Sequence, residues 1–444
     1  MSAKRRPERE SAPKRVARRV VQSAAGAFSH ASGPPAPGGS KQAEGAIERA
    51  VAALGPGPLT EAALARHVAP LFSRALAADP ARIYLANHSL GRPLDATADD
   101  VREGLDAWYA RMGGAWDAWM AETIAFRSRI ATLLHAPRAD CVVPKTSAGQ
   151  GLRAILNTFE RDVVPRVVAT RGEFDSLDVI LREYARRGRI ALTLVEPRDD
   201  GRFDTADIVG SIGGGVDLVV VSDVVFNTGQ RLDDVDRIVR ATHAAGGRAL
   251  LDVYHSLGAL PVDVLESNVD FAVGGSYKYL RGGPGACFLY LHPRHLDGSL
   301  RTLDIGWFAK RAPFAYERPD PPQLAAGGDA FLESTPPVLT AYQARAGQRL
   351  AIALNPSRIR AYSLFQQQRL VSLLAMHGID AQGGTEDRGA FAVVTTPRAT
   401  AWCERLAERG VTTDARGRHL RLCPDILTTE AEMARAAKAL RDVG

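Results

Sequence analysis

Short apolar segments alternate with helical segments through the middle of this chain, and this alternation limits the possible folds more than any other feature. The apolar segments have the length and β-branched content of buried strands; they are 166–169, 190–195, 217–222, 248–255, 270–273 and 286–291. Helical segments are expected at 125–134, 146–160, 176–187 and 235–245. Strands joined through helices are usually parallel. The pattern therefore predicts an α/β fold with a mainly parallel sheet and helices on both faces.

The C-terminal part of the chain has a different pattern. A long helical region begins near residue 339 and continues through 360–377, followed by strands at 391–395 and 420–423 and a helix at 400–409. A capping box, Thr429 to Glu432, opens a final helix. We therefore predict four parts: a disordered basic tail (1–45), an N-terminal segment packing on the small domain and active site (46–90), a large cofactor-binding domain (91–338) and a small α+β domain (339–444).

The positive charge of the chain is confined to its first 45 residues. These hold nine Lys or Arg and three Glu, a net charge of +6, and the whole chain also has a net charge of +6. The remainder is neutral, which argues against nucleic acid as its partner. The tail is rich in Ala, Ser, Pro and Gly and is expected to be disordered. A transit peptide, a solvated extension and a mis-assigned start codon are alternative interpretations.

Other global features favour a cytoplasmic protein without membrane spans. No stretch of 18 consecutive apolar residues occurs, and the tail lacks the apolar core of a secretory signal, so neither membrane insertion nor export is expected. The four cysteines, at 141, 287, 403 and 423, have no C-x-x-C or zinc-site spacing. No metal site is predicted, and the cysteines are expected to be reduced core residues.

A glycine-rich element, Gly274 to Gly285, connects the last two predicted strands of the large domain and contains Lys278. A lysine at this place reaches inward from a strand end, where burial lowers its pKa and exposes a nucleophilic amine. Asp252 and His255 end the preceding strand. Pyridoxal 5'-phosphate requires a lysine that bonds to its aldehyde and an acid that keeps its ring nitrogen protonated. Taken singly, such a lysine is more often a solvated loop residue and such an acid a helix cap.

The segment 250–295, LLDVYHSLGALPVDVLESNVDFAVGGSYKYLRGGPGACFLYLHPRH, resembles the cofactor-lysine region of the kynureninases, in the class V aminotransferase group of fold-type I enzymes. Shorter similar elements lie at 84–93, 306–308, 331–339 and 419–422, so the resemblance covers about residues 80 to 440. It implies a fold-type I, pyridoxal-phosphate-dependent transferase fold. It also implies a homodimer with its active site at the subunit interface.

The resemblance further implies the roles of individual residues. Lys278, Asp252 and Tyr277 are the implied catalytic residues, and Arg421 and Ser89 the implied substrate-binding residues. The implied cofactor-binding residues are Thr146, Ser147, Phe174, Asp223, Asp252, His255, Tyr277, Lys278, Trp307 and Thr335, of which Trp307 and Thr335 enter from the partner subunit. The residue pattern alone allows other interpretations: a plain helix cap for Ser147, a core aromatic for Phe174, a turn acid for Asp223 and an exposed strand residue for Arg421.

The chain departs from the family pattern at two places. After the ring-covering Phe174 the family has Pro, a hydroxyl residue and Asp, whereas this chain has Asp175, Ser176 and Leu177. Either Asp175 takes over the function of the missing acid or that contact is absent. The segment 108–119, where the family often has a histidine near the substrate ring, contains three tryptophans and no histidine. His88 is either its substitute or an ordinary loop histidine.

The implied activity is hydrolytic cleavage of the Cβ–Cγ bond of an amino acid such as L-kynurenine, giving anthranilate and alanine, a step of tryptophan catabolism. Lys278 would act as general base and Tyr277 as a proton relay. Another class V activity, an aminotransferase or a cysteine desulfurase-like lyase, is the alternative. A desulfurase needs a reactive cysteine before the carboxylate-binding arginine, and here Cys403 lies in a predicted helix. A non-catalytic regulator that binds nucleic acid through the tail is a third hypothesis.

Overall fold

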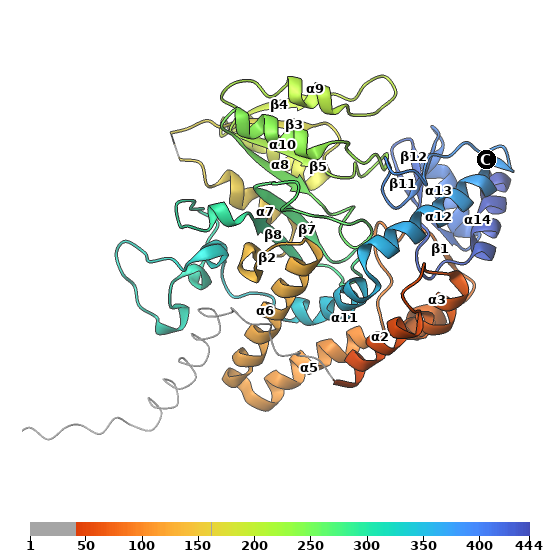
Figure 1. Ribbon diagram of the computed structural model, residues 1–444, viewed down its shortest axis with the longest axis horizontal. Coiled ribbons are helices and arrows are strands. Elements are labelled where there is room, and N and C mark those ends of the chain that lie inside the picture. Colours follow the sequence, from red (N-terminus) through yellow and green to blue (C-terminus); the bar gives the residue numbers. More distant parts are fainter. Residues whose placement is uncertain (1–40, 161) are drawn as a thin grey trace, which may run out of the picture.

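The computed structural model describes residues 41–160 and 162–444. Most of the predicted disordered tail, residues 1–40, lies outside the described part of the chain. Helix α2 (Lys41–Ala53) already begins before the predicted end of this tail. Figure 1 shows a large domain built on a central sheet, with the C-terminal domain beside it.

The central sheet has seven strands in the order β2-β8-β7-β6-β5-β3-β4. They are β2 (Val142–Lys145), β3 (Arg166–Thr170), β4 (Ala191–Val195), β5 (Leu218–Ser222), β6 (Arg248–Asp252), β7 (Phe271–Gly275) and β8 (Cys287–Leu291). Neighbouring strands are parallel except where β8 pairs with β7 and β2, both antiparallel. The predicted mainly parallel sheet is confirmed, and β8 is its one reversed strand.

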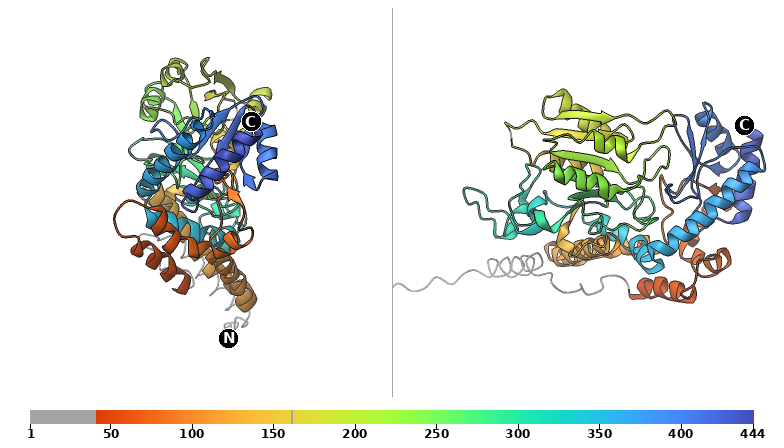
Figure 2. Two further views of the ribbon diagram at one scale, coloured as in Figure 1. Left: turned by 90° about the vertical axis from the view of Figure 1, so that its right-hand side faces the viewer. Right: turned by 45° about the horizontal axis from the view of Figure 1, so that its top comes forward.

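Both faces of this sheet are covered. Along β5, Leu218 and Val220 pack in a core with α7 (Ala148–Leu156) and α8 (Asp175–Arg186), while Val219 and Val221 pack in a second core with α6 (Trp116–Leu133) and α10 (Val235–Ala244). Successive side chains of a strand point to opposite faces, so a strand buried on both sides must be apolar throughout. This explains the unbroken apolar run that the sequence shows there. Figure 2 shows helices on the two sides of the sheet.

The C-terminal domain is a small antiparallel sheet covered by helices. Its strands are ordered β11 (Asp414–Arg416), β12 (His419–Leu422) and β9 (Ala392–Thr395). Its helices are α12 (Pro356–Ala375), α13 (Ala399–Glu408) and α14 (Glu430–Val443), and the predicted capping box between Thr429 and Glu432 begins α14. Helix α11 (Leu339–Leu354) leads into this domain from the large one. The division into domains at residue 339 stays a prediction, since Ala341, Ala344 and Ala351 of α11 pack in the core of the large domain.

The segment before residue 95 packs largely against the C-terminal domain. It contains α3 (Glu61–His67), α4 (Ser73–Ala77) and β1 (Ile83–Tyr84), which pairs in parallel with β10 (Val411–Thr412). Asn87 continues this contact by donating its side-chain amide to the Cys423 carbonyl at 2.9 Å. These contacts carry the chain from the small domain toward the lysine loop.

The helices differ from the sequence-based expectation at several places. Helix α7 ends at Leu156, so the predicted extension to residue 160 is wrong, and α9 (Thr205–Gly210) was not predicted. Helix α5 (Ala96–Arg111) was also missed, because its buried side includes charged groups. Its Asp100 lies 3.1 Å from the Arg345 guanidinium of α11, a buried ion pair that hydrophobic periodicity cannot reveal. Among the described residues, no helix combines the length and apolarity needed to cross a membrane.

Candidate active site

A cavity of about 200 Å³ opens at the carboxyl ends of β5 and β6. Seven of the predicted site residues line it: Thr146, Ser147, Phe174, Asp252, His255, Tyr277 and Lys278. Four of its other lining residues were not predicted: Ser222, Tyr254, Pro284 and Cys287. Ligands of parallel sheets bind in the crevice at the carboxyl ends of the strands, so the position of this cavity is that of a ligand-binding site.

Glycines hold the lysine loop against its neighbours. A Cβ on Gly275 would lie 2.0 Å from the Tyr254 hydroxyl oxygen, and one on Gly282 would lie 2.8 Å from the Ala344 Cα of α11. Gly91, from the N-terminal segment, donates its N–H to the Tyr277 carbonyl at 2.8 Å, and a Cβ there would lie 2.0 Å from the Lys278 carbonyl oxygen. Close contacts that only glycine permits therefore hold the loop against Tyr254, α11 and the N-terminal segment.

Lys278 points into the cavity and is only 4% exposed. Its Nζ lies 2.6 Å from His255 Nε2 and 4.8 Å from the centroid of the Tyr254 ring. Burial and the positive charge of Arg421 together lower the pKa of Lys278 to about 7, although the carboxylate of Asp252 opposes the shift. Near neutral pH a large fraction of this amine is unprotonated and nucleophilic.

Asp252 ends β6 and is buried in the same cavity. Its Oδ1 accepts the backbone N–H of Tyr254 at 2.8 Å. Burial raises the pKa of Asp252 to about 6, although this hydrogen bond and the charge of Lys278 favour the ionised form. A buried carboxylate without an ion-pair partner is poised to stabilise a cationic group that enters the cavity.

His255 is buried and uncharged. Burial and the nearby charge of Lys278 hold the pKa of His255 well below its usual value. Its Nε2 lies 2.6 Å from Lys278 Nζ, and its buried Nδ1 has no hydrogen-bond partner among the described residues. An unpaired buried ring nitrogen at a cavity wall indicates a polar ligand.

Thr146 and Ser147 lie where α7 begins. The Ser147 hydroxyl oxygen accepts the Gln150 N–H at 3.1 Å, and the Thr146 N–H is donated to the Gln150 side-chain oxygen at 2.7 Å. A helix N-terminus with hydroxyl groups suits a phosphate. Together with the amine, the carboxylate, the orphaned histidine nitrogen and Phe174, these groups fit pyridoxal 5'-phosphate.

Phe174 immediately precedes α8 and lies between two acids with opposite environments. Its ring packs edge-on against Phe226, with centroids 5.3 Å apart. Asp175 is exposed in the first turn of α8 and does not line the cavity, so it does not replace the missing family acid. Glu173 is buried behind the cavity wall. The sequence-based analysis overlooked it, although its place next to Phe174 was a signal.

Three predicted cofactor-binding residues do not line this cavity. Asp223 is buried, and its carboxylate lies 3.8 Å from Arg231 Nε. Trp307 donates its indole N–H to the Thr335 hydroxyl at 3.2 Å. Thr335 lines an adjacent cavity of about 160 Å³, which shares Thr146 and Cys287 with the first. The contacts predicted for Trp307 and Thr335 belong to a partner subunit, and they stay predictions.

Arg421 is 2% exposed, so the pattern-based interpretation of an exposed strand residue is wrong. Its Nε donates to Asp414 Oδ1 at 2.9 Å, and its Nη1 donates to the Phe226 carbonyl. Ser89 donates its hydroxyl to the other Asp414 oxygen at 2.8 Å. The two predicted substrate-binding residues, Arg421 and Ser89, therefore meet at Asp414, which the sequence-based analysis did not identify.

His88 is not an ordinary loop histidine. It is fully buried, its ring stacks on Phe391 with centroids 4.8 Å apart, and its centroid lies 6.4 Å from that of His255. Burial and the charge of Arg421 hold the pKa of His88 well below its usual value. His88 therefore forms part of the uncharged wall between Arg421 and the lysine.

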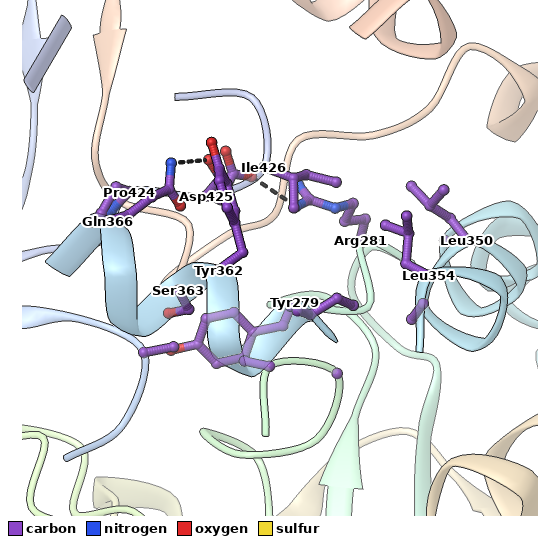
Figure 3. Close-up of a pocket in the computed structure, with 16 residues that line it drawn as sticks. Tyr279, Arg281, Leu350, Leu354, Tyr362, Ser363, Gln366, Pro424, Asp425 and Ile426 are labelled. Atoms are coloured by element: carbon purple, nitrogen blue, oxygen red, sulfur yellow. Dashed lines mark hydrogen bonds and ion pairs between the residues drawn. The ribbon is translucent and has the colours of Figure 1, made fainter. Parts of the chain in front are cut away.

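A smaller cavity, of about 40 Å³, lies where the lysine loop meets the C-terminal domain (Figure 3). Arg281 of the loop reaches toward Asp425 of the small domain, and their closest atoms, Nη2 and Oδ2, are 2.7 Å apart. Arg92 binds the other oxygen of Asp425 at 2.6 Å. One buried carboxylate thus joins the N-terminal segment, the lysine loop and the small domain.

Comparisons with known proteins agree with this architecture. The family model described as aminotransferase class-V matches residues 112–436. The chain is 28% identical to a kynureninase of Burkholderia pseudomallei over 81% of this chain and 89% of that enzyme. It is 30% identical to a kynureninase of Deinococcus radiodurans over 58% of this chain and 62% of that enzyme.

Solved structures show the same fold at lower identity. The cystine C-S lyase C-DES, in complex with its product cysteine persulfide, has a TM-score of 0.74 at 18% identity, covering 83% of this chain and all of that one. A cysteine desulfurase from Thermococcus onnurineus has a TM-score of 0.71 at 17% identity, covering 84% and 96%. The predicted fold-type I architecture is confirmed.

Proposed function

The chain belongs to the class-V aminotransferase family, whose cofactor is pyridoxal 5'-phosphate, and we propose that it hydrolyses the Cβ–Cγ bond of L-kynurenine-type amino acids, releasing anthranilate and alanine. The similarity to a kynureninase along 89% of that enzyme carries this proposal. The cavity supports it, because it brings together the Lys278 amine, whose pKa is about 7, the buried acid Asp252 and the neutral His255.

Each group has a role in this reaction. When bound, the cofactor would supply a sink for the electron pair that deprotonation leaves at the substrate's α-carbon. Lys278, with its lowered pKa, removes the Cα proton, and the Asp252 carboxylate balances positive charge at the ring nitrogen. Neutral His255 would offer its unpaired ring nitrogen, Nδ1, to a polar group of the bound cofactor. Arg421 binds the substrate carboxylate after exchanging part of its contact with Asp414.

Tyr277 is the proposed proton relay for cleavage. Its half-buried ring packs 5.0 Å from the Tyr254 ring and lines the cavity next to Lys278. Burial raises the pKa of the Tyr277 hydroxyl, which therefore stays protonated and able to donate near neutral pH. Such a donor suits protonation of Cβ, which keeps the electron pair when the Cβ–Cγ bond breaks after water has added at the γ-carbonyl.

A desulfurase-like activity is the second candidate, because the structural neighbours include such enzymes. It requires a thiolate nucleophile, which needs a lowered pKa. Burial instead raises the pKa of Cys287, in the cavity wall, to about 11. Cys403 lies in α13 with Sγ 3.4 Å from the Thr413 hydroxyl. These thiols do not have the environment of a sulfur-transfer nucleophile.

We also propose a cytoplasmic homodimer that contributes to tryptophan catabolism. Large apolar side chains are exposed near the end of α5, at Trp108, Tyr109 and Met112, and on the loop around Leu303 and Tyr316. Exposed apolar groups of this size indicate an interface with another subunit. Light scattering after size-exclusion chromatography should give twice the mass of the chain, and a monomer would contradict the dimer.

Product analysis tests the activity. Purified holoenzyme would be incubated separately with L-kynurenine, 3-hydroxykynurenine, cysteine, and alanine with a keto acid. Anthranilate and alanine in equal amounts from kynurenine are expected. Sulfide from cysteine, or a new amino acid from the keto acid, with no anthranilate from kynurenine, would replace the proposal by the corresponding alternative.

A further inference from the structure

Glu173 is a buried carboxyl group for which neither the fold nor the proposed reaction requires a charge. It lies in the turn between β3 and α8, and only 3% of its surface is exposed. Its Oε1 accepts the Thr170 hydroxyl at 2.6 Å, and its Oε2 accepts the Ser222 hydroxyl at 2.6 Å. Within the described residues, no lysine, arginine or histidine forms an ion pair with it. A buried carboxylate held by neutral hydrogen-bond donors is costly to ionise.

This acid lies behind the part of the cavity wall that contains Ser222 and Asp252. Ser222, which donates to Glu173, ends β5 and is the register partner of Asp252 on β6. Ser222 and Asp252 both line the cavity, as does Phe174, the neighbour of Glu173 in the chain. The Ser222 hydroxyl therefore connects Glu173 to the cavity wall that Ser222 and Asp252 form together.

We propose that Glu173 is a positioning residue of the cofactor site, which holds a proton beside Asp252 and controls through its charge how readily Asp252 ionises when the cofactor binds. Two buried acids behind one cavity wall repel each other when both are ionised. A cationic ring nitrogen at Asp252 reduces that repulsion, and the pair then gives up a proton. This role depends on the cofactor and not on the substrate, so it goes beyond the proposed hydrolysis.

The surrounding charges agree with this role. Burial raises the pKa of Glu173 to about 7, its two hydroxyl hydrogen bonds lower it, and the negative charge of Asp252 raises it. Asp223, which follows Ser222, is a third buried acid, and burial raises its pKa as well. Lys278 is the positive group that acts on Asp252, and its charge favours the ionised form of that acid. Glu173 is therefore expected to change its protonation state within the pH range 6 to 8 in which cofactor binding would be measured.

Proton release on cofactor binding tests the proposal without measuring turnover. Pyridoxal 5'-phosphate would be titrated into apoprotein by calorimetry in two buffers of different ionisation enthalpy, from pH 6 to pH 8, to obtain the number of protons released. Glu173→Gln keeps the shape and one of the two accepted hydrogen bonds, with the other hydroxyl turned to accept from the amide, but it cannot release a proton. Because a group with a pKa of about 7 is half protonated at pH 7, this variant should release about half a proton less per subunit.

Asp175→Asn is the matched control, since it removes the exposed acid on the other side of Phe174 and should behave like the wild type. Thr170→Val is a second variant, in case Glu173→Gln does not fold. It removes one hydrogen bond to the carboxylate, so the pH of greatest release should move upward. An unchanged proton number in Glu173→Gln, an unmoved maximum in Thr170→Val, or an equal loss in Asp175→Asn would overturn the proposal.

Discussion

Lys278 Nζ lies 2.6 Å from His255 Nε2, and both side chains are buried. A neutral histidine shares a hydrogen bond with the amine without adding charge, so the amine is oriented while its pKa stays low. The amine is therefore held in place before any ligand arrives, which reduces the entropy lost when it reacts.

The first prediction concerns the identity of the reactive lysine. Purified holoenzyme should show a visible absorbance band, and borohydride should remove it and join the cofactor irreversibly to Lys278. Lys278→Ala should lose this attachment while binding cofactor non-covalently. Mass spectrometry of the reduced protein locates the modified residue. Attachment to buried Lys145 instead would show that the assignment is wrong.

The second prediction follows from the lowered pKa of Lys278. In the apoprotein this pKa is about 7, below the usual value of 10.5, so the unfolded chain binds more protons between these values and stability rises with pH there. The penalty for burying the ammonium is complete below pH 7. Lys278→Met should therefore stabilise the apoprotein by about 2–4 kcal/mol more at pH 6 than at pH 10. Urea unfolding measures this difference, and Lys438→Met, on the exposed side of α14, should show none.

The third prediction concerns Asp252. Asp252→Asn keeps the shape and the contact with the Tyr254 N–H but cannot balance a positive ring nitrogen. Turnover should fall by about 100-fold or more, equivalent to ~2.7 kcal/mol of barrier, with the cofactor still bound. Turnover and bound cofactor would be measured on the same sample. A fully loaded variant with wild-type turnover would exclude this role.

The fourth prediction concerns Arg421. Arg421→Lys keeps the charge but loses the planar fork, which contributes roughly 1.5–3 kcal/mol to carboxylate binding. Both kynurenine and alanine should bind about 10- to 100-fold more weakly in titrations followed by the cofactor's absorbance. Equal losses for both ligands indicate a shared carboxylate site. Unchanged titrations would remove Arg421 from the substrate site.

The fifth prediction concerns the buried ion pairs of Asp425. This residue binds Arg92 and Arg281 at 2.6 and 2.7 Å, so Asp425→Asn leaves two buried guanidinium groups without their counter-ion. The free energy of unfolding should fall by about 3–5 kcal/mol. Asp178→Asn, which breaks an exposed pair with Arg182, should have a far smaller effect in the same denaturation experiment. Equal effects would show that the Asp425 contacts contribute little.

Much of the fold follows from local sequence. The apolar run of β5 predicts a strand buried on both faces, and Gly274 to Gly285 predicts the loop that carries Lys278, because side-chain period and glycine content act over a few residues. The order of Asp252, His255 and Lys278 along the chain indicated the cofactor before any contact was known, and family membership agrees with it.

The surroundings of these groups depend on contacts between distant segments. Glu173 meets Ser222 across 49 positions of the chain, and Arg421 approaches Ser89 across 332. Burial of Arg421, the exposure of Asp175 and the neutrality of His255 all result from such packing, which also determines each local dielectric. Local pattern therefore specifies which residues carry the chemistry, whereas tertiary packing sets their charge states, because desolvation depends on which segments of the chain pack around each group.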